Sequence, residues 1–86
     1  MHARSLVARN LRKLRVRRGL SQEALAVDAQ VDRTYVSRVE RGLENPTVAV
    51  LERLAIALDI EIVRFFEKPK AGEREPETLK GGRKRR

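Results

Sequence analysis

The sequence predicts an all-α domain over residues 1–67, followed by a flexible basic tail over residues 68–86. Three observations predict this class. Apolar residues recur at helical spacing between residues 4 and 67. The sequence contains no alternating β-branched run and no Asn-Gly or Asp-Gly pair that would indicate a β-hairpin. Finally, residues that begin or end helices divide this region into five segments.

The first segment is a basic helix with one apolar face. Val7, Leu11 and Leu14 have the i, i+4, i+7 spacing of residues that share a helix face, and most of the other positions are Arg or Lys. Gly19 can end this helix in the left-handed conformation that glycine adopts without steric cost.

Two short helices follow, joined by about three residues. Ser21 is suited to cap the second helix, and Asp32 to cap the third after a break at Gln30-Val31. Val36 and Val39, three residues apart, are expected to face inward from the third helix, which Gly42 ends. The second helix has a small apolar face, whose alanines would allow close packing by another helix, and it consists of Leu25, Ala26 and Ala29.

The fourth helix is expected after the turn and cap at residues 45–47, and Asp59 ends it. A short fifth helix is expected at about residues 61–67. The apolar residues assigned to the fourth helix are Val48, Leu51, Leu54, Ala55 and Leu58, and those assigned to the fifth are Ile60, Ile62, Phe65 and Phe66. Beyond residue 67 only Leu79 is a large aliphatic residue, so this tail cannot bury enough apolar area to offset its ordering entropy.

Positive charge is concentrated at both ends of the chain, whose formal net charge is +8. Residues 1–20 carry seven Lys or Arg and no acid, and residues 68–86 carry eight basic and three acidic residues. The middle, residues 21–67, has five basic and nine acidic residues. This distribution suits a polyanionic partner, although a solvated surface gives the same pattern.

The composition argues against several classes of function. The chain has no cysteine, and its one histidine, His2, lies near the terminus, so we expect no disulfide and no metal. Because the sequence shows no Ser/His/Asp set and no Gly-rich phosphate loop, we expect neither an enzyme nor a cofactor. No apolar run approaches the roughly 20 residues that span a bilayer. We therefore expect a soluble, cytoplasmic protein.

The second and third helices have the helix-turn-helix pattern, in which one helix braces the next and the next presents polar side chains to a major groove. Spacing alone is equally compatible with an ordinary helical bundle. The residues add to the pattern: SQEALA at 21–26, VDRTYVSRVERG at 31–42 and NPT at 45–47 resemble the phage-repressor-like (XRE) helix-turn-helix family. The strings DRTYVS at 32–37 and FFE at 65–67 resemble the controller proteins of restriction–modification systems in particular.

This resemblance implies a five-helix fold and a homodimer that binds a double-stranded DNA operator. The base-reading residues that it implies are Arg33, Thr34, Ser37 and Arg38, with Tyr35 at the rim. The chemistry agrees, because arginine can bind O6 and N7 of guanine with two hydrogen bonds. Residues 33, 34, 37 and 38 also share one helix face, opposite the valines.

Phosphate contacts and a structural ion pair are further expectations. Gln22 is either a phosphate contact, as in the family, or simply a residue at the start of a helix. The other expected phosphate contacts are Arg12, Arg17, Arg18 and Arg41. The resemblance implies a salt bridge between Arg15 and Glu40 that links the first helix to the end of the recognition helix.

Three residues depart from the family pattern. Gln30 and Asp59 stand where glycine is usual, and a left-handed backbone at Gln30 would cost about 1–2 kcal/mol. Glu44 stands where relatives often have Arg or Lys, and we expect it to repel phosphate, which argues against minor-groove reading by this loop.

A dimer interface is expected around the fourth and fifth helices, at Ile56, Ile62 and Val63, unless these are core or isolated surface residues. The leading hypothesis is thus a sequence-specific transcriptional regulator. The alternative is an antitoxin that neutralises a partner toxin through the C-terminal tail and represses its own operon. A membrane-surface role for the first helix is disfavoured because that helix lacks Trp and Phe anchors.

Overall fold

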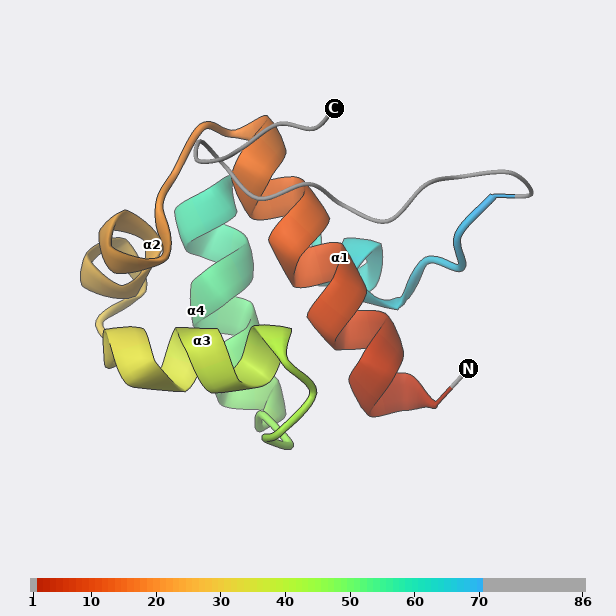
Figure 1. The fold of residues 1–86 in the computed structure, drawn as a ribbon. Coiled ribbons are helices and arrows are strands. Elements are labelled where there is room, and N and C mark those ends of the chain that lie inside the picture. Colours follow the sequence, from red (N-terminus) through yellow and green to blue (C-terminus); the bar gives the residue numbers. More distant parts are fainter. Residues whose placement is uncertain (1, 71–86) are drawn as a thin grey trace, which may run out of the picture.

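The computed structural model describes residues 2–70, which form four α-helices and one 3-10 helix with no strand among them. Helices α1 and α4 lie at two sides of the core, α2 stands at one end, and α3 runs crosswise at the edge (Figure 1). The elements in chain order are α1 (Ala3–Arg17), α2 (Gln22–Ala29), α3 (Arg33–Glu40), α4 (Val48–Leu58) and the 3-10 helix η1 (Ile62–Phe66).

Helix α1 buries the face that its apolar spacing predicts. Val7, Leu11 and Leu14 all lie in the core, and Gly19 ends the helix with a φ of +73°. Asn10 lies on the same buried side, where its Nδ2 atom donates hydrogen bonds of 2.8 Å to the backbone oxygens of Phe65 and Glu67. This side chain fastens the residues around η1 to α1, and the two elements lie against each other in Figure 1.

The turn between α2 and α3 is left-handed at Gln30, where φ is 61° and ψ is 47°. The backbone N–H of Val31 donates to the oxygen of Ala26 at 3.0 Å and closes the end of α2. Arg53 of α4 braces the turn, since its Nε donates to the oxygen of Ala29 at 3.2 Å and its Nη2 to that of Gln30 at 2.7 Å. A charged donor from another helix thus holds a conformation that glycine would adopt at lower cost.

Two of the three expected helix caps form a side-chain hydrogen bond. Oγ of Ser21 accepts a 2.9 Å hydrogen bond from the backbone N–H of Ala24. Asp32 holds the N-cap position of α3 with extended backbone, but its side chain accepts no capping hydrogen bond in this helix. Thr47 caps α4 as expected from the turn and cap at residues 45–47, because its hydroxyl accepts a hydrogen bond from the N–H of Val50 at 3.1 Å.

Two apolar residues assigned to the core lie at the surface. Val48 is 73% exposed because it is the first residue of α4, where the helix has not yet reached its packing partners. Phe65 is fully buried but Phe66 is exposed, since successive residues of a 3-10 helix point in directions about 120° apart. The expected fifth helix is this short 3-10 helix.

The tail prediction falls almost entirely outside the described residues. Lys68 and Lys70 are exposed, and residues 71–86 lie beyond the part of the chain that the structure describes, as does Met1. Within residues 2–70 no helix combines the length and apolarity needed to cross a membrane. The same residues contain no group of three or more His, Cys, Asp or Glu side chains placed to hold a metal ion.

Candidate nucleic-acid interface

Helix α3 separates packing residues from polar residues. Val36 and Val39 are essentially inaccessible to solvent and contact α1 and α2 through the common core. Arg33 and Thr34, on the first turn, are exposed, and Ser37 is partly exposed. Within the described chain the Arg33 side chain forms no hydrogen bond or ion pair. This turn can therefore contact a partner without losing any internal interaction.

Tyr35 differs from its exposed neighbours on α3. It is half-buried and packs against the core, so it can offer only part of its ring to a partner. Burial raises the pKa of the Tyr35 phenol above its ordinary value of 10.0, and the negative charge of Glu44 raises it further. The phenol therefore stays protonated at neutral pH, where it can both donate and accept a hydrogen bond.

Arg38 is already engaged by the loop that follows α3. Its Nε donates to Oε2 of Glu44 at 2.7 Å, and the two side chains are 43% and 33% exposed. Its Nη2 lies 3.4 Å from the backbone oxygen of Leu43. Sequence reasoning treated Arg38 as a free base-reading residue and Glu44 only as a charge that repels phosphate. It missed their pairing, for which the one available signal was opposite charge across a tight helix end.

A buried carboxylate joins α1, α2 and α3. Oε2 of Glu40 accepts a hydrogen bond from Nε of Arg15 at 2.6 Å, and Oε1 accepts from Nη2 of Arg15 at 3.0 Å, so the expected pair is present and bidentate. Nε2 of Gln22 donates to Oε1 at 3.0 Å, and Nε of Arg12 lies 3.7 Å from the same atom. Glu40 thus orients two residues that the sequence assigned to phosphate contacts.

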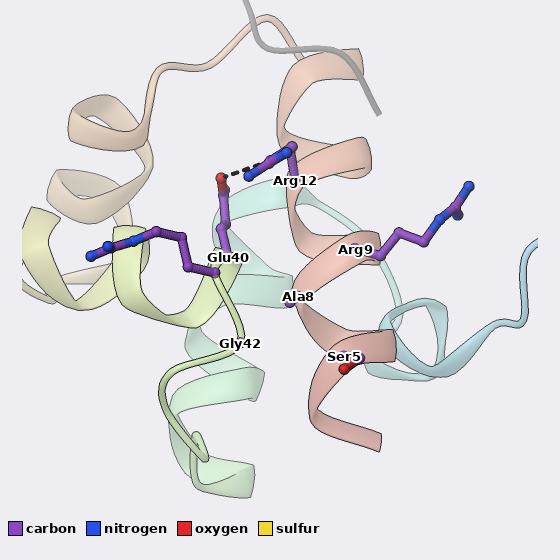
Figure 2. A pocket seen from close by; sticks show the side chains of 7 residues that line it. Ser5, Ala8, Arg9, Arg12, Glu40 and Gly42 are labelled. Atoms are coloured by element: carbon purple, nitrogen blue, oxygen red, sulfur yellow. Dashed lines mark ion pairs between the residues drawn. The ribbon is translucent and has the colours of Figure 1, made fainter. Parts of the chain in front are cut away.

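A shallow pocket lies between α1 and the end of α3, with the Arg12–Glu40 pair on one wall (Figure 2). Ser5 and Gly42 also line it, and Arg9 extends away from Glu40 in this view. Because the arginine side chains diverge, they do not form a convergent anion site. The pocket is the outer edge of the contact between α1 and α3.

The remaining basic residues assigned to phosphate are exposed. Arg17 and Arg18 lie at the end of α1, and Nη1 of Arg18 is 3.9 Å from Oδ2 of Asp59. Arg41 follows α3, with its Nε 3.4 Å from the backbone oxygen of Ser37. These weak, solvated contacts leave the three guanidinium groups available to an anionic partner.

The residues assigned to a dimer interface differ in burial. Ile56 on α4 is 73% exposed and Val63 in η1 is 61% exposed, whereas Ile62 is half-buried and packs against the core. Phe66, also exposed, lies on the same short 3-10 helix as Val63. Exposed apolar side chains thus lie on α4 and on η1, two elements that are in contact, and the dimer interface itself stays a prediction.

The comparisons with known proteins identify the class. A helix-turn-helix family model (HTH_3) matches residues 11–65, and the chain belongs to this family. Members of the family include transcriptional regulators. A hypothetical transcription factor from Neisseria meningitidis is 41% identical over 66 residues, which cover 77% of this chain and 62% of that protein. The chain spans only 41% of the length of the regulator SlrR from Bacillus subtilis.

Restriction–modification controller proteins stand among its relatives of known structure. C.AhdI from Aeromonas hydrophila superposes with a TM-score of 0.72 and 44% identity, covering 73% of this chain and 96% of that one. The C.Esp1396I tetramer, solved with its natural 35 base-pair operator, gives a TM-score of 0.70 and 36% identity over 77% of this chain and 87% of that one. The resemblance inferred from DRTYVS and FFE is therefore confirmed. These relatives give the antitoxin alternative no support.

Proposed function

We infer that this protein is a sequence-specific transcriptional regulator that binds a palindromic operator as a dimer, with α3 in the major groove. The observation that carries this proposal is the division of α3: its valines are buried while Arg33 and Thr34 stand in solvent. A helix anchored by one face and open on the other can enter a groove as a rigid unit. The family relationship, and the operator named for the C.Esp1396I structure, support the same function.

In this proposal the exposed first turn of α3 reads base edges. Arg33 donates two hydrogen bonds to a guanine, Thr34 offers a hydroxyl and a methyl group, and Ser37 and Arg38 read the next positions. Tyr35 contributes at the rim, in keeping with its half-buried position. Other polar and basic residues contact phosphates in this proposal and set the register, and they are Gln22, Arg12, Arg17, Arg18 and Arg41.

The dimer forms in this proposal through Ile56, Ile62 and Val63. A single eight-residue recognition helix reads only a few base pairs, so a second copy on a symmetric site adds affinity and specificity. The exposed Ile56 and Val63 side chains supply apolar area that a two-fold interface would cover. No ligand-sensing or catalytic role is proposed for the described residues.

Footprinting on the DNA upstream of the protein's own gene tests the proposal, with Arg33→Ala as the informative variant. The wild-type chain should protect a symmetric site, and Arg33→Ala should lose about 1–3 kcal/mol of discrimination at one base pair of each half-site. Arg17→Ala is the control, because a lost phosphate contact weakens binding to all sequences and lowers the salt slope by about one. Equal weakening of all sequences by Arg33→Ala would show that Arg33 does not read bases.

A further inference from the structure

The protein itself occupies one edge of the Arg38 guanidinium. Nε and Nη2 form the side-on edge of an arginine, and here Nε donates to Glu44 at 2.7 Å while Nη2 faces the oxygen of Leu43 at 3.4 Å. The loop is itself closed onto the helix, because the N–H of Leu43 donates to the oxygen of Arg38 at 2.9 Å. The guanidinium plane is therefore held by a loop that is itself hydrogen-bonded to the end of α3.

The end-on edge of Arg38, formed by Nη1 and the second N–H of Nη2, remains open. In the part of the chain that the structure describes, Nη1 makes no hydrogen bond, and the side chain is 43% exposed. The end-on pair, Nη1 and Nη2, has two nearly parallel N–H groups with the spacing of O6 and N7 on guanine. Arg38 lies one helical turn beyond Thr34, on the exposed side of α3.

Stability does not account for this arrangement. An ion pair this exposed contributes little to folding stability, since solvent screens it and both side chains lose rotamer freedom. The Glu44 carboxylate also opposes DNA binding, because a fixed negative charge beside the recognition helix repels every phosphate that approaches. The pair adds little to folding stability and weakens nonspecific binding. Its effect on the orientation of the Arg38 guanidinium therefore explains it.

We propose that Glu44 is a specificity-determining positioning residue, which holds the side-on edge of Arg38 so that its end-on edge reads a guanine in each half-site. Glu44 acts through Arg38 and contacts no base. The inference rests on the proposed function of α3 and adds to it a second guanine contact, beside that of Arg33, and the residue that orients it. Preorganisation means that the rotamer entropy of Arg38 is lost on folding and not on binding.

Selection from a random duplex library tests this with the purified 86-residue chain and five variants. In Arg38→Ala, the preference for guanine at one position per half-site should fall by roughly 5- to 150-fold, the value of one bidentate contact. In Glu44→Ala it should fall by roughly twofold to tenfold, the value of ordering one long side chain, while affinity for unrelated DNA rises. Glu44→Gln keeps an acceptor for Nε and should keep the preference, although it also binds unrelated DNA more tightly.

Asp28→Asn is the matched control for charge, because it removes one negative charge from an exposed position on α2. It should leave the selected motif unchanged. In the double variant Arg38→Ala/Glu44→Ala, the loss at that guanine should equal the loss in Arg38→Ala alone, since Glu44 has no other route to the base. Thermal melting of each variant checks that the fold is intact.

The outcomes separate this inference from the proposed function. A wild-type chain that selects no motif overturns the proposed function and the inference with it. A wild-type motif that Arg38→Ala and Glu44→Ala both leave intact overturns the inference alone. The same holds if Glu44→Ala and Glu44→Gln bind all sequences more tightly with an unaltered motif, because Glu44 would then be only a repulsive charge.

Discussion

Glu40 and Glu44 each bind the Nε of an arginine at nearly the same distance, 2.6 Å and 2.7 Å, yet they lie in opposite environments. The Glu40 carboxylate is completely inaccessible and has donors from Arg15 and Gln22, with Arg12 nearby. Glu44 is one-third exposed and has one arginine. The comparison teaches that distance does not decide what an ion pair does. A buried pair holds helices together, and an exposed one can orient a side chain for a partner.

The largest effect is expected from Glu40→Ala. It would leave Arg15 buried without a counter-charge and should lower the free energy of unfolding by about 3–5 kcal/mol. Glu44→Ala is the matched variant and should cost no more than about 1 kcal/mol. Thermal and urea unfolding of both variants measure the difference. Similar melting temperatures for the two would break the comparison.

Asn10→Ala tests how much a buried but uncharged hydrogen-bonding side chain contributes to the free energy of unfolding. The variant removes both donors to the backbone oxygens of Phe65 and Glu67, and leaves at least one buried carbonyl unpaired. The expected cost is about 1–3 kcal/mol. Hydrogen exchange around η1 should quicken more than exchange in α3, and uniform quickening would argue against a local fastening role.

Much of the fold follows from the sequence because it depends on local periodicity. Spacing and residue type predict the buried faces of α1 and α3, the cap at Ser21 and the turn at Gly19. The exposure of Val48 and Phe66 was not predictable, because it depends on where α4 begins and on the 3-10 geometry of η1.

The candidate site was less predictable where it depends on partners far apart in the chain. The roles of Asn10 and Arg53 need the positions of η1 and of the α2–α3 turn, which periodicity does not contain. The only sequence signal for Asn10 is its place on the buried face between Val7 and Leu11. The pairing of Arg38 with Glu44 similarly depends on the path of the loop, although the base-reading assignments themselves stay predictions.

Arg53→Ala extends the comparison to an exposed arginine that binds only backbone oxygens. Losing its bonds to Ala29 and Gln30 should destabilise the left-handed turn by about 1 kcal/mol. Gln30→Gly should offset this loss by about 1 kcal/mol, because glycine adopts positive φ freely. Chemical denaturation of the single and double variants measures both effects. A destabilising Gln30→Gly would contradict the strain assigned to this residue.

The smallest effect concerns the phenol of Tyr35, the chain's one tyrosine. Its pKa is raised in the folded protein by burial and then by Glu44, so folding stability is unaffected at neutral pH and falls as pH rises past about 10. Absorbance titration should show the midpoint above 10.0 in the native chain and lower in Glu44→Gln. An unchanged midpoint in that variant would place the Glu44 carboxylate away from α3.

The division of α3 has an evolutionary consequence. The two buried valines and Glu40 of α3 stabilise the fold. Residues 33, 34, 37 and 38 can therefore vary with little effect on the free energy of unfolding. A duplicated gene could therefore drift toward a new target site while the scaffold stays constant. Because Glu44 is tied to Arg38, those two positions would be expected to change together.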